Sequence, residues 1–312
     1  MARPRRSPVR LSPSLLPATD MPSPEQIGKH RIAIGIDEAT LSPVVLDFEA
    51  DPHFIVFGDT GCGKSNVLKL IMQGIVARKT PKEARMVVID YRRSLLDTAA
   101  TEHRIGYAVA STAAAELVQE VRHALLKRLP PADLTPDQLR RRNWWQRSDL
   151  YVVVDDYDLV ATSNNPLQPL AELLPQARDI GLHLIMARQM GGASRAMYDQ
   201  AVQRLKEMAS PALIMSGNRE EGVLFGKVRP QPLPPGRGFH VDRKSGDPLR
   251  RLRTRSSRPG HVEGPSRYRV GLLHQHPLSW RAGLRSGRGE GRLDQDPLMS
   301  AGSKPSGRLR NG

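Results

Sequence analysis

The 312-residue sequence predicts an α/β fold with a mainly parallel β-sheet flanked by helices. Two observations support this class. Short apolar segments alternate along the chain with segments of helical spacing, which is the pattern of βαβ units. Several apolar segments, such as FIVF at 54–57 and YVVV at 151–154, show no alternation with polar residues. Such segments are expected for strands that are covered on both faces.

The predicted elements begin with a β-hairpin formed by RIAIGID (31–37) and SPVVLDF (42–48). PHFIVFG (52–58) predicts the first buried strand, and ARMVVID (84–90) predicts the next. The spacing of apolar residues also predicts helices over 64–79 and 112–129. The apolar stripe of the first helix is Val67, Leu68, Leu70, Ile71, Ile75 and Val76, and that of the second is Leu117, Val121, Leu125 and Leu126.

The second half of the pattern continues this alternation. DLYVVVDDYD (149–158) predicts a buried strand that ends in acidic residues, and PLAELLPQARDIG (169–181) predicts a helix that ends at Gly181. LHLIMARQ (182–189) predicts a further buried strand. SPALIMSG (210–217) predicts a strand at the edge of the sheet.

The composition changes at both ends of this region. Residues 1–30 are rich in Pro, Ser and Arg, and the chain after PPGRGFHV (234–241) is rich in Arg, Gly, Pro and Ser without a sustained period. We therefore predict a flexible N-terminal arm (1–30), one folded domain (31–242) and a basic tail without stable structure (243–312).

The net charge of +15 is concentrated in the predicted tail, where 16 Lys and Arg face 5 Asp and Glu, against 31 and 27 in the rest of the chain. A nearly neutral body argues against a nucleic-acid-binding domain. The single cysteine, Cys62, excludes an intrachain disulfide and is consistent with a reducing compartment. No apolar run approaches the roughly 20 residues that span a bilayer. We expect a cytoplasmic chain that docks on a membrane complex.

The segment GDTGCGKS matches the phosphate-binding pattern G-x-x-x-x-G-K-[ST], and it lies between a predicted strand and a predicted helix. Its glycines allow successive N–H groups to converge on anionic oxygens, and the helix adds its positive end. Lys64 is expected to reach the β- and γ-phosphates, and the Ser65 hydroxyl is expected to bind Mg²⁺. The predicted nucleotide-binding residues are Gly58, Asp59, Thr60, Gly61, Cys62, Gly63, Lys64, Ser65 and Asn66. The chain is therefore predicted to be a P-loop NTPase.

The predicted strand YVVVDD (151–156) supplies the acidic half of such a site. Asp155 is expected to hold Mg²⁺ as the Walker B carboxylate. Asp156 stands where many ATPases have a glutamate that polarises the attacking water. Because aspartate is one methylene shorter, weak turnover is expected. Gln189 ends the predicted strand LHLIMARQ, and its amide is a candidate sensor of the γ-phosphate.

Three other features of the sequence leave alternatives open. Asp90, at the end of a predicted strand, is expected to fix Arg92 or Arg93 rather than to contact nucleotide. Cys62 is interpreted as a small spacer, with a reactive thiol at the helix N-terminus as the alternative. The candidates for an arginine finger are Arg122, Arg128, Arg178 and Arg195.

Together, FIVFGDTGCGKS, YVVVDDYDLV and GLHLIMARQ resemble the FtsK/SpoIIIE branch of the additional-strand, RecA-like P-loop ATPases. The chain also looks like the C-terminal ATPase module of EccC proteins of mycobacterial type VII (ESX) secretion. This resemblance rests on the segments IGIDEATLSPVVLDFEADPHFIVFGD, VVIDYRRSLLD and GNREEGVLFG, and on the PPGRG that follows the last of them. The resemblance covers residues 30–242 and implies that the predicted domain (31–242) is an FtsK/SpoIIIE-type ATPase domain.

The resemblance implies a Mg²⁺-dependent ATPase whose catalytic set is Lys64, Asp155, Asp156 and Gln189, with Ser65 and Asp155 on the metal. It implies a subunit of a protein-export machine, peripheral to the inner membrane, which couples ATP to the export of WXG100-class proteins through their C-terminal signal. The implied partners are membrane-anchored EccC-type components, in a homo- or hetero-oligomeric ring. One alternative is a DNA translocase, although the nearly neutral charge of the chain up to residue 242 argues against DNA as a partner. The other alternative is a non-hydrolysing nucleotide-binding module.

Overall fold

The computed structural model describes residues 21–141, 144–145, 148–242 and 250–253. All of them lie in Met1–Glu263, the first of the two compact units into which the chain divides. Most of the predicted arm (1–20) and most of the predicted tail (243–249 and 254–312) lie outside the described residues. The division of the chain into arm, domain and tail therefore stays a prediction.

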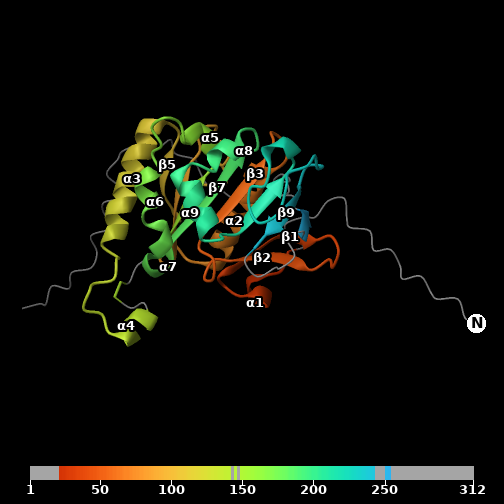
Figure 1. The fold of residues 1–312 in the computed structure, drawn as a ribbon. Coiled ribbons are helices and arrows are strands. Elements are labelled where there is room, and N and C mark those ends of the chain that lie inside the picture. Colours follow the sequence, from red (N-terminus) through yellow and green to blue (C-terminus); the bar gives the residue numbers. More distant parts are fainter. Residues whose placement is uncertain (1–20, 142–143, 146–147, 243–249, 254–312) are drawn as a thin grey trace, which may run out of the picture. The chain divides into compact units, whose positions relative to one another are not determined.

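The described residues form one ten-stranded sheet in the order β2-β1-β10-β9-β8-β3-β7-β6-β4-β5 (Figure 1). The strands from β8 to β5 in this order run parallel, and β9, β10, β1 and β2 are added to them in antiparallel pairs. The predicted α/β class is confirmed, and β7 is the additional strand between β3 and β6. The strands are β1 (Arg31–Asp37), β2 (Pro43–Asp47), β3 (Phe54–Gly58), β4 (Ala84–Ile89), β5 (Arg104–Ala108), β6 (Asp149–Val154), β7 (Leu182–Gln189), β8 (Ala212–Met215), β9 (Arg237–Val241) and β10 (Arg250–Arg253).

The helices cover both faces of this sheet. They are α1 (Pro24–Ile27), α2 (Lys64–Arg78), α3 (Ser111–Leu126), α4 (Pro136–Arg141), α5 (Tyr157–Val160), α6 (Gln168–Ala171), α7 (Ala177–Ile180), α8 (Ala193–Ala196) and α9 (Gln200–Glu207), with the 3-10 helices η2 (Leu174–Gln176) and η3 (Arg219–Glu221). In the described residues, no helix has the length and apolar character needed to cross a bilayer.

Two hydrophobic clusters lie on the opposite faces of the sheet. One contains α2, the β1–β2 hairpin and strand residues such as Val153; the other contains α3, α5 to α9 and strand residues such as Val152 and Val154. Alternate residues of β6 thus face opposite sides, as the pleat requires. By the same alternation, Asp155 follows the strand with the side-chain direction of Val153, toward α2.

The predicted helices differ from the observed ones in detail. Val76 and Leu126, placed on apolar stripes, are 37% and 36% exposed, whereas Ala114 and Val118 of α3 are buried. The predicted helix over 169–181 is broken into α6, η2 and α7. Pro175 lies at the break, where it lacks the N–H that a continuous helix needs. The helix end at Gly181 is confirmed by its left-handed φ of 67°.

The C-terminal side of the sheet shows the largest difference. SPALIMSG was expected at the edge, but β8 pairs with β3 on one side and β9 on the other. Arg250–Arg253, within the predicted unstructured tail, form β10 between β9 and β1. The expectation of no stable structure after residue 242 is wrong for these four residues, which connect the hairpin to the rest of the sheet.

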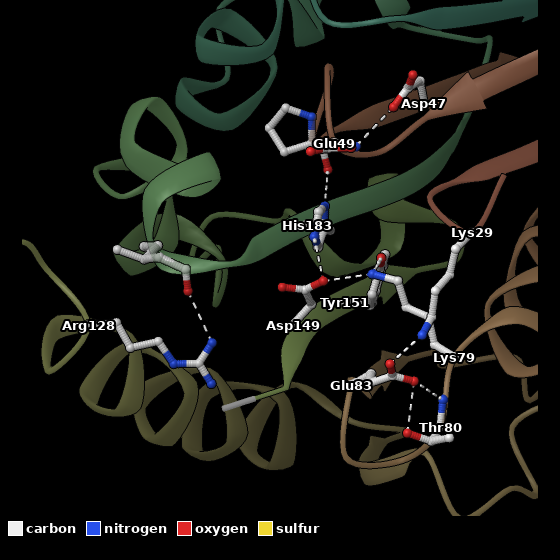
Figure 2. Close-up of polar contacts among 12 residues, drawn as sticks. Lys29, Asp47, Glu49, Lys79, Thr80, Glu83, Arg128, Asp149, Tyr151 and His183 are labelled. Atoms are coloured by element: carbon white, nitrogen blue, oxygen red, sulfur yellow. Dashed lines mark hydrogen bonds and ion pairs between the residues drawn. The ribbon is translucent and has the colours of Figure 1, made fainter. Parts of the chain in front are cut away.

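A polar network lies at the start of β6 and β7, the sheet edge opposite the phosphate-binding loop (Figure 2). Lys79, at the end of α2, donates hydrogen bonds from Nζ to Asp149 Oδ2 (2.7 Å) and to the Tyr151 hydroxyl (3.0 Å). The His183 ring stacks on Tyr151 with centroids 4.3 Å apart, and its Nδ1 lies 3.2 Å from the Pro52 carbonyl. Although burial opposes it, the neighbouring His183 and Lys79 lower the pKa of Asp149. The network fastens the far end of α2 to the sheet.

Candidate functional site

The phosphate-binding loop joins β3, which ends at Gly58, to α2, which begins at Lys64. Gly61 (φ 76°) and Gly63 (φ 110°) adopt the left-handed backbone that glycine accepts at low cost. The loop is braced by hydrogen bonds from Asp59 N–H to the Ser216 carbonyl (2.8 Å) and from Gly236 N–H to the Cys62 carbonyl (2.8 Å). Neither hydrogen bond was predictable from the sequence, because Ser216 and Gly236 come from distant segments.

The first turn of α2 presents N–H groups to the loop. The N–H groups of a helix's first turn have no acceptor within the helix and carry its positive end. In α2 these belong to Lys64, Ser65 and Asn66, with Gly63 as the N-cap residue, and no side chain caps them. The loop and the helix terminus thus make a concave donor surface that suits phosphate oxygens.

Ser65 and Asp155 are brought together from α2 and the end of β6. The Ser65 hydroxyl donates a hydrogen bond of 2.6 Å to Asp155 Oδ2. Asp155 is 1% exposed, and its N–H donates to the Ile89 carbonyl of the neighbouring strand (3.0 Å). The two predicted metal ligands therefore lie in direct contact, although 90 residues separate them in the sequence.

The donor set at this point fits a small divalent cation. Burial raises the pKa of Asp155 to about 6; the Ser65 hydrogen bond opposes this shift, and the Asp156 and Asp90 carboxylates add to it. A buried carboxylate whose charge is disfavoured gains stability from a cation, and hydroxyl and carboxylate oxygens are the ligands that Mg²⁺ prefers. The residues present therefore fit Mg²⁺ held beside a nucleotide phosphate.

The side chains of Lys64 and Gln189 lie close to each other at the phosphate-binding loop. Lys64 Nζ donates to the Asp59 carbonyl (3.1 Å) and lies 3.5 Å from Gln189 Oε1, while Gln189 Nε2 donates to Thr60 Oγ1 (3.1 Å). Because β3 and β7 pair with Gly58 opposite Gln189, the amide lies beside the first glycine of the loop. The structure thus places the predicted sensor side chain against the phosphate-binding loop.

Gln189 is itself held by two neighbours that the sequence did not indicate. Its N–H donates to Asp158 Oδ1 (2.8 Å), and its carbonyl accepts from Arg188 Nε (3.2 Å). Arg188 is 8% exposed and lines a cavity of about 330 Å³ with Asp158, Arg195 and Asp199. These contacts fix the backbone from which the amide reaches the loop.

The Asp156 carboxylate has a different partner from that of Asp155. Its Oδ2 lies 3.1 Å from Arg92 Nε, on the segment that follows β4. Asp90 was expected to fix Arg92 or Arg93. The Arg92 side chain pairs with Asp156 instead, whereas the Arg93 N–H donates to the Asp90 carbonyl (3.3 Å). The Asp90 side chain accepts hydrogen bonds at Oδ2 from the Leu95 N–H (2.7 Å) and the Tyr107 hydroxyl (2.7 Å).

Cys62 has the character of a spacer and not of a reactive thiol. It is 4% exposed, and its sulfur lies 3.8 Å from the Met215 sulfur. Burial raises the pKa of the Cys62 thiol, which outweighs the nearby Lys64. Among the arginine-finger candidates, Arg128 is buried, donates to the Ile180 carbonyl (3.0 Å) and stacks on Trp145 (4.7 Å), so it serves this chain's own packing.

Comparisons with known proteins identify the family of this chain. Residues 18–216 match the model of the FtsK/SpoIIIE family. The ESX secretion system protein EccC of Thermomonospora curvata is 63% identical over 246 residues, which cover 79% of this chain and 19% of that protein. The ESX-4 secretion system protein EccC4 of Mycobacterium tuberculosis is 44% identical over 218 residues, which cover 70% of this chain and 18% of that protein. This chain thus spans about a fifth of the length of these relatives.

A solved structure shows the same fold. Thermomonospora curvata EccC, with its ATPases 2 and 3 in complex with a signal sequence peptide, superposes with a TM-score of 0.78 at 61% identity, covering 81% of this chain and 45% of that one. The predicted resemblance to FtsK/SpoIIIE ATPases and to EccC proteins is confirmed. With the family model matching well over half of its residues, the chain belongs to the FtsK/SpoIIIE family of P-loop ATPases.

Proposed function

We propose that this chain is the C-terminal ATPase module of an EccC-type type VII (ESX) secretion machine and that it binds and hydrolyses ATP with Mg²⁺. The observation that carries this proposal is the 2.6 Å hydrogen bond between Ser65 and Asp155. It unites the two halves of a Mg²⁺–nucleotide site. Lys64 and Gln189 complete the site from the loop and from the additional strand.

Each of these residues has a distinct role in the proposed site. The N–H groups from Gly58 to Asn66 bind the phosphates, and Lys64 neutralises their charge. Ser65 and Asp155 hold Mg²⁺, which supplies charge stabilisation to the transferring phosphoryl group when bound. The Gln189 amide, already within reach of Lys64 and Thr60, senses the terminal phosphate.

The secretion role is supported by the relatives. Two of them are named as ESX secretion system proteins, and a solved structure of Thermomonospora curvata EccC is described in complex with a signal sequence peptide. We propose that this module likewise recognises the C-terminal signal of WXG100-class proteins. Its partners are membrane-anchored EccC-type components in an oligomeric ring, which place it at the cytoplasmic side of the membrane.

A second candidate is a nucleotide-binding module with weak or no turnover. One observation favours it: the Asp156 carboxylate is paired with Arg92. A DNA translocase has less support, because the chain up to residue 242 carries 31 Lys and Arg against 27 Asp and Glu.

The test is a titration of the full chain, with ATP and Mg²⁺ at moderate salt, against a WXG100-type C-terminal peptide and against duplex DNA. The secretion role is supported if the chain binds the peptide and if any DNA binding disappears as the salt concentration rises. DNA binding that persists in a chain truncated after Arg253, without peptide binding, contradicts it and favours the translocase.

A further inference from the structure

The Arg92–Asp156 ion pair joins an exposed side chain to a covered one. Arg92 Nε lies 3.1 Å from Asp156 Oδ2, and the two side chains are 58% and 14% exposed. The guanidinium therefore keeps one side in solvent while it holds a carboxylate that is mostly removed from water.

The backbone of Asp156 is adapted to this contact. Asp156 has φ 46° and ψ 56°, a left-handed conformation that is costly for most residues and tolerated by aspartate. It occupies the N-cap position of α5, where an aspartate usually accepts a hydrogen bond from the first turn. Its side chain accepts no such bond. The carboxylate has instead turned to Arg92.

Hydrogen bonds to Asp90 hold the segment that carries Arg92. Asp90 is 1% exposed and accepts hydrogen bonds from Leu95 N–H and the Tyr107 hydroxyl, both at 2.7 Å. Arg93, with φ 58°, closes the turn by donating its N–H to the Asp90 carbonyl (3.3 Å). Arg92 is thus presented to Asp156 by a turn with defined geometry.

We propose that Arg92 is a positioning residue that withholds Asp156 from the reaction. The ion pair directs the Asp156 carboxylate toward the turn after β4, while the adjacent Asp155 carboxylate is directed to Ser65. A carboxylate that is paired with a guanidinium is a weaker acceptor for the hydrogen of an attacking water. Release of Asp156 therefore increases turnover without changing how nucleotide binds. This inference rests on the proposed ATPase function.

The test compares steady-state hydrolysis and nucleotide affinity in the full chain and in Arg92→Gln, Arg92→Lys and Asp156→Asn variants. We expect Arg92→Gln to raise kcat about two- to fivefold, the scale of one partly exposed ion pair, with unchanged KM and unchanged affinity for a fluorescent ATP analogue. Arg92→Lys, which keeps the pair, stays near the original kcat. Adding Asp156→Asn to Arg92→Gln removes the gain.

The matched control is Arg93→Gln, which removes the same charge one position away and is expected to leave kcat unchanged. A kcat that is unchanged or lower in Arg92→Gln overturns the proposal, as does a gain that survives Asp156→Asn. Absence of turnover in both the original chain and Arg92→Gln also overturns it. Nucleotide binding that still depends on Lys64 would then show that the proposed nucleotide site stands independently of this inference.

Discussion

Gly58, the first glycine of the loop, has no room for a side chain. A Cβ atom at this position would lie 2.4 Å from Cys62 Sγ and 2.9 Å from Met215 Cβ, whereas ordinary contacts begin near 3.4 Å. Gly58 is not among the glycines with positive φ, so alanine can adopt its backbone conformation. The effect of Gly58→Ala is therefore steric.

The expected cost follows from the burial of both neighbours. Cys62 is 4% exposed and Met215 is fully buried, so neither can move into solvent. Inserting a methyl group into such a site costs about 1–3 kcal/mol. We expect Gly58→Ala to lower the free energy of unfolding by about 2 kcal/mol. Because Cys62 belongs to the loop, its displacement is also expected to weaken nucleotide binding by about tenfold, or about 1.4 kcal/mol.

A second substitution separates the steric cause from other causes. Cys62→Ala removes the sulfur at 2.4 Å but leaves Met215 Cβ at 2.9 Å, so it should restore about half of the lost stability. Gly61→Ala is the control. A Cβ atom at Gly61 meets nothing within 4 Å, but its φ of +76° imposes backbone strain that Cys62→Ala cannot relieve.

The assay is urea unfolding followed by circular dichroism, with nucleotide affinity measured on the folded chains. Partial recovery of Gly58→Ala by Cys62→Ala, with no recovery of Gly61→Ala, supports the packing argument. The reasoning is refuted if Gly58→Ala is as stable as the original chain, or if Cys62→Ala stabilises both glycine variants equally.

Three further outcomes are expected. Asp149→Asn removes the negative charge that lies 2.7 Å from the Lys79 ammonium, which is 5% exposed, and should cost about 2–3 kcal/mol. Because the folded-state pKa of Asp149 is depressed, this contribution is fully present above the unfolded value near pH 4 and is lost progressively as pH falls from there through the lower folded value. Urea unfolding at pH 7 and pH 3 checks this, and an equal cost at both values contradicts it. Truncation after Asp242 removes β10 and should destabilise the chain in thermal melts, whereas truncation after Arg253 should not; equal melting temperatures would show that β10 does not contribute. Asp158→Ala removes the acceptor for the Gln189 N–H, and we expect kcat to fall severalfold while KM changes less. Leu159→Ala, which alters an exposed side chain of α5, is the control. An unaltered kcat in Asp158→Ala would mean that Asp158 does not position Gln189.

The inner parallel strands β3, β4, β6 and β7 were predictable because they are buried on both faces, whereas the edge strand β5, which is mostly half-buried, was not predicted. Short apolar runs without polar residues, such as FIVF, VVI and YVVV, are typical of strands that are covered on both faces. The phosphate-binding motif marks the turn after the first of these strands. In the antiparallel half, the β1–β2 hairpin was predicted, but β10 was not. β10 has the sequence RRLR, which lacks a strand pattern, and β8 lies away from the edge because β9 pairs with its second side.

The site likewise has a part that the sequence predicts and a part that it does not. Gly58 to Ser65 and Asp155 occur in motifs that reflect their chemistry, so the sequence predicts that they follow strands of one sheet; these are β3 and β6, on either side of β7. The partner of Asp156 depends on which side chain of a distant turn reaches it. Arg92 and Arg93 were both available, and the turn held by Asp90 selects Arg92.

Equilibrium binding of ATP to the original chain and to Lys64→Ala, with and without Mg²⁺, tests the proposed nucleotide site most directly. We expect Mg²⁺-dependent binding by the original chain and at least about a tenfold loss of affinity in Lys64→Ala, because the variant removes the only ammonium that the described residues place within 3.5 Å of Gln189 Oε1. Equal affinity of the two chains, or binding that is indifferent to Mg²⁺, would contradict the assignment of Lys64, Ser65 and Asp155 to a Mg²⁺–nucleotide site.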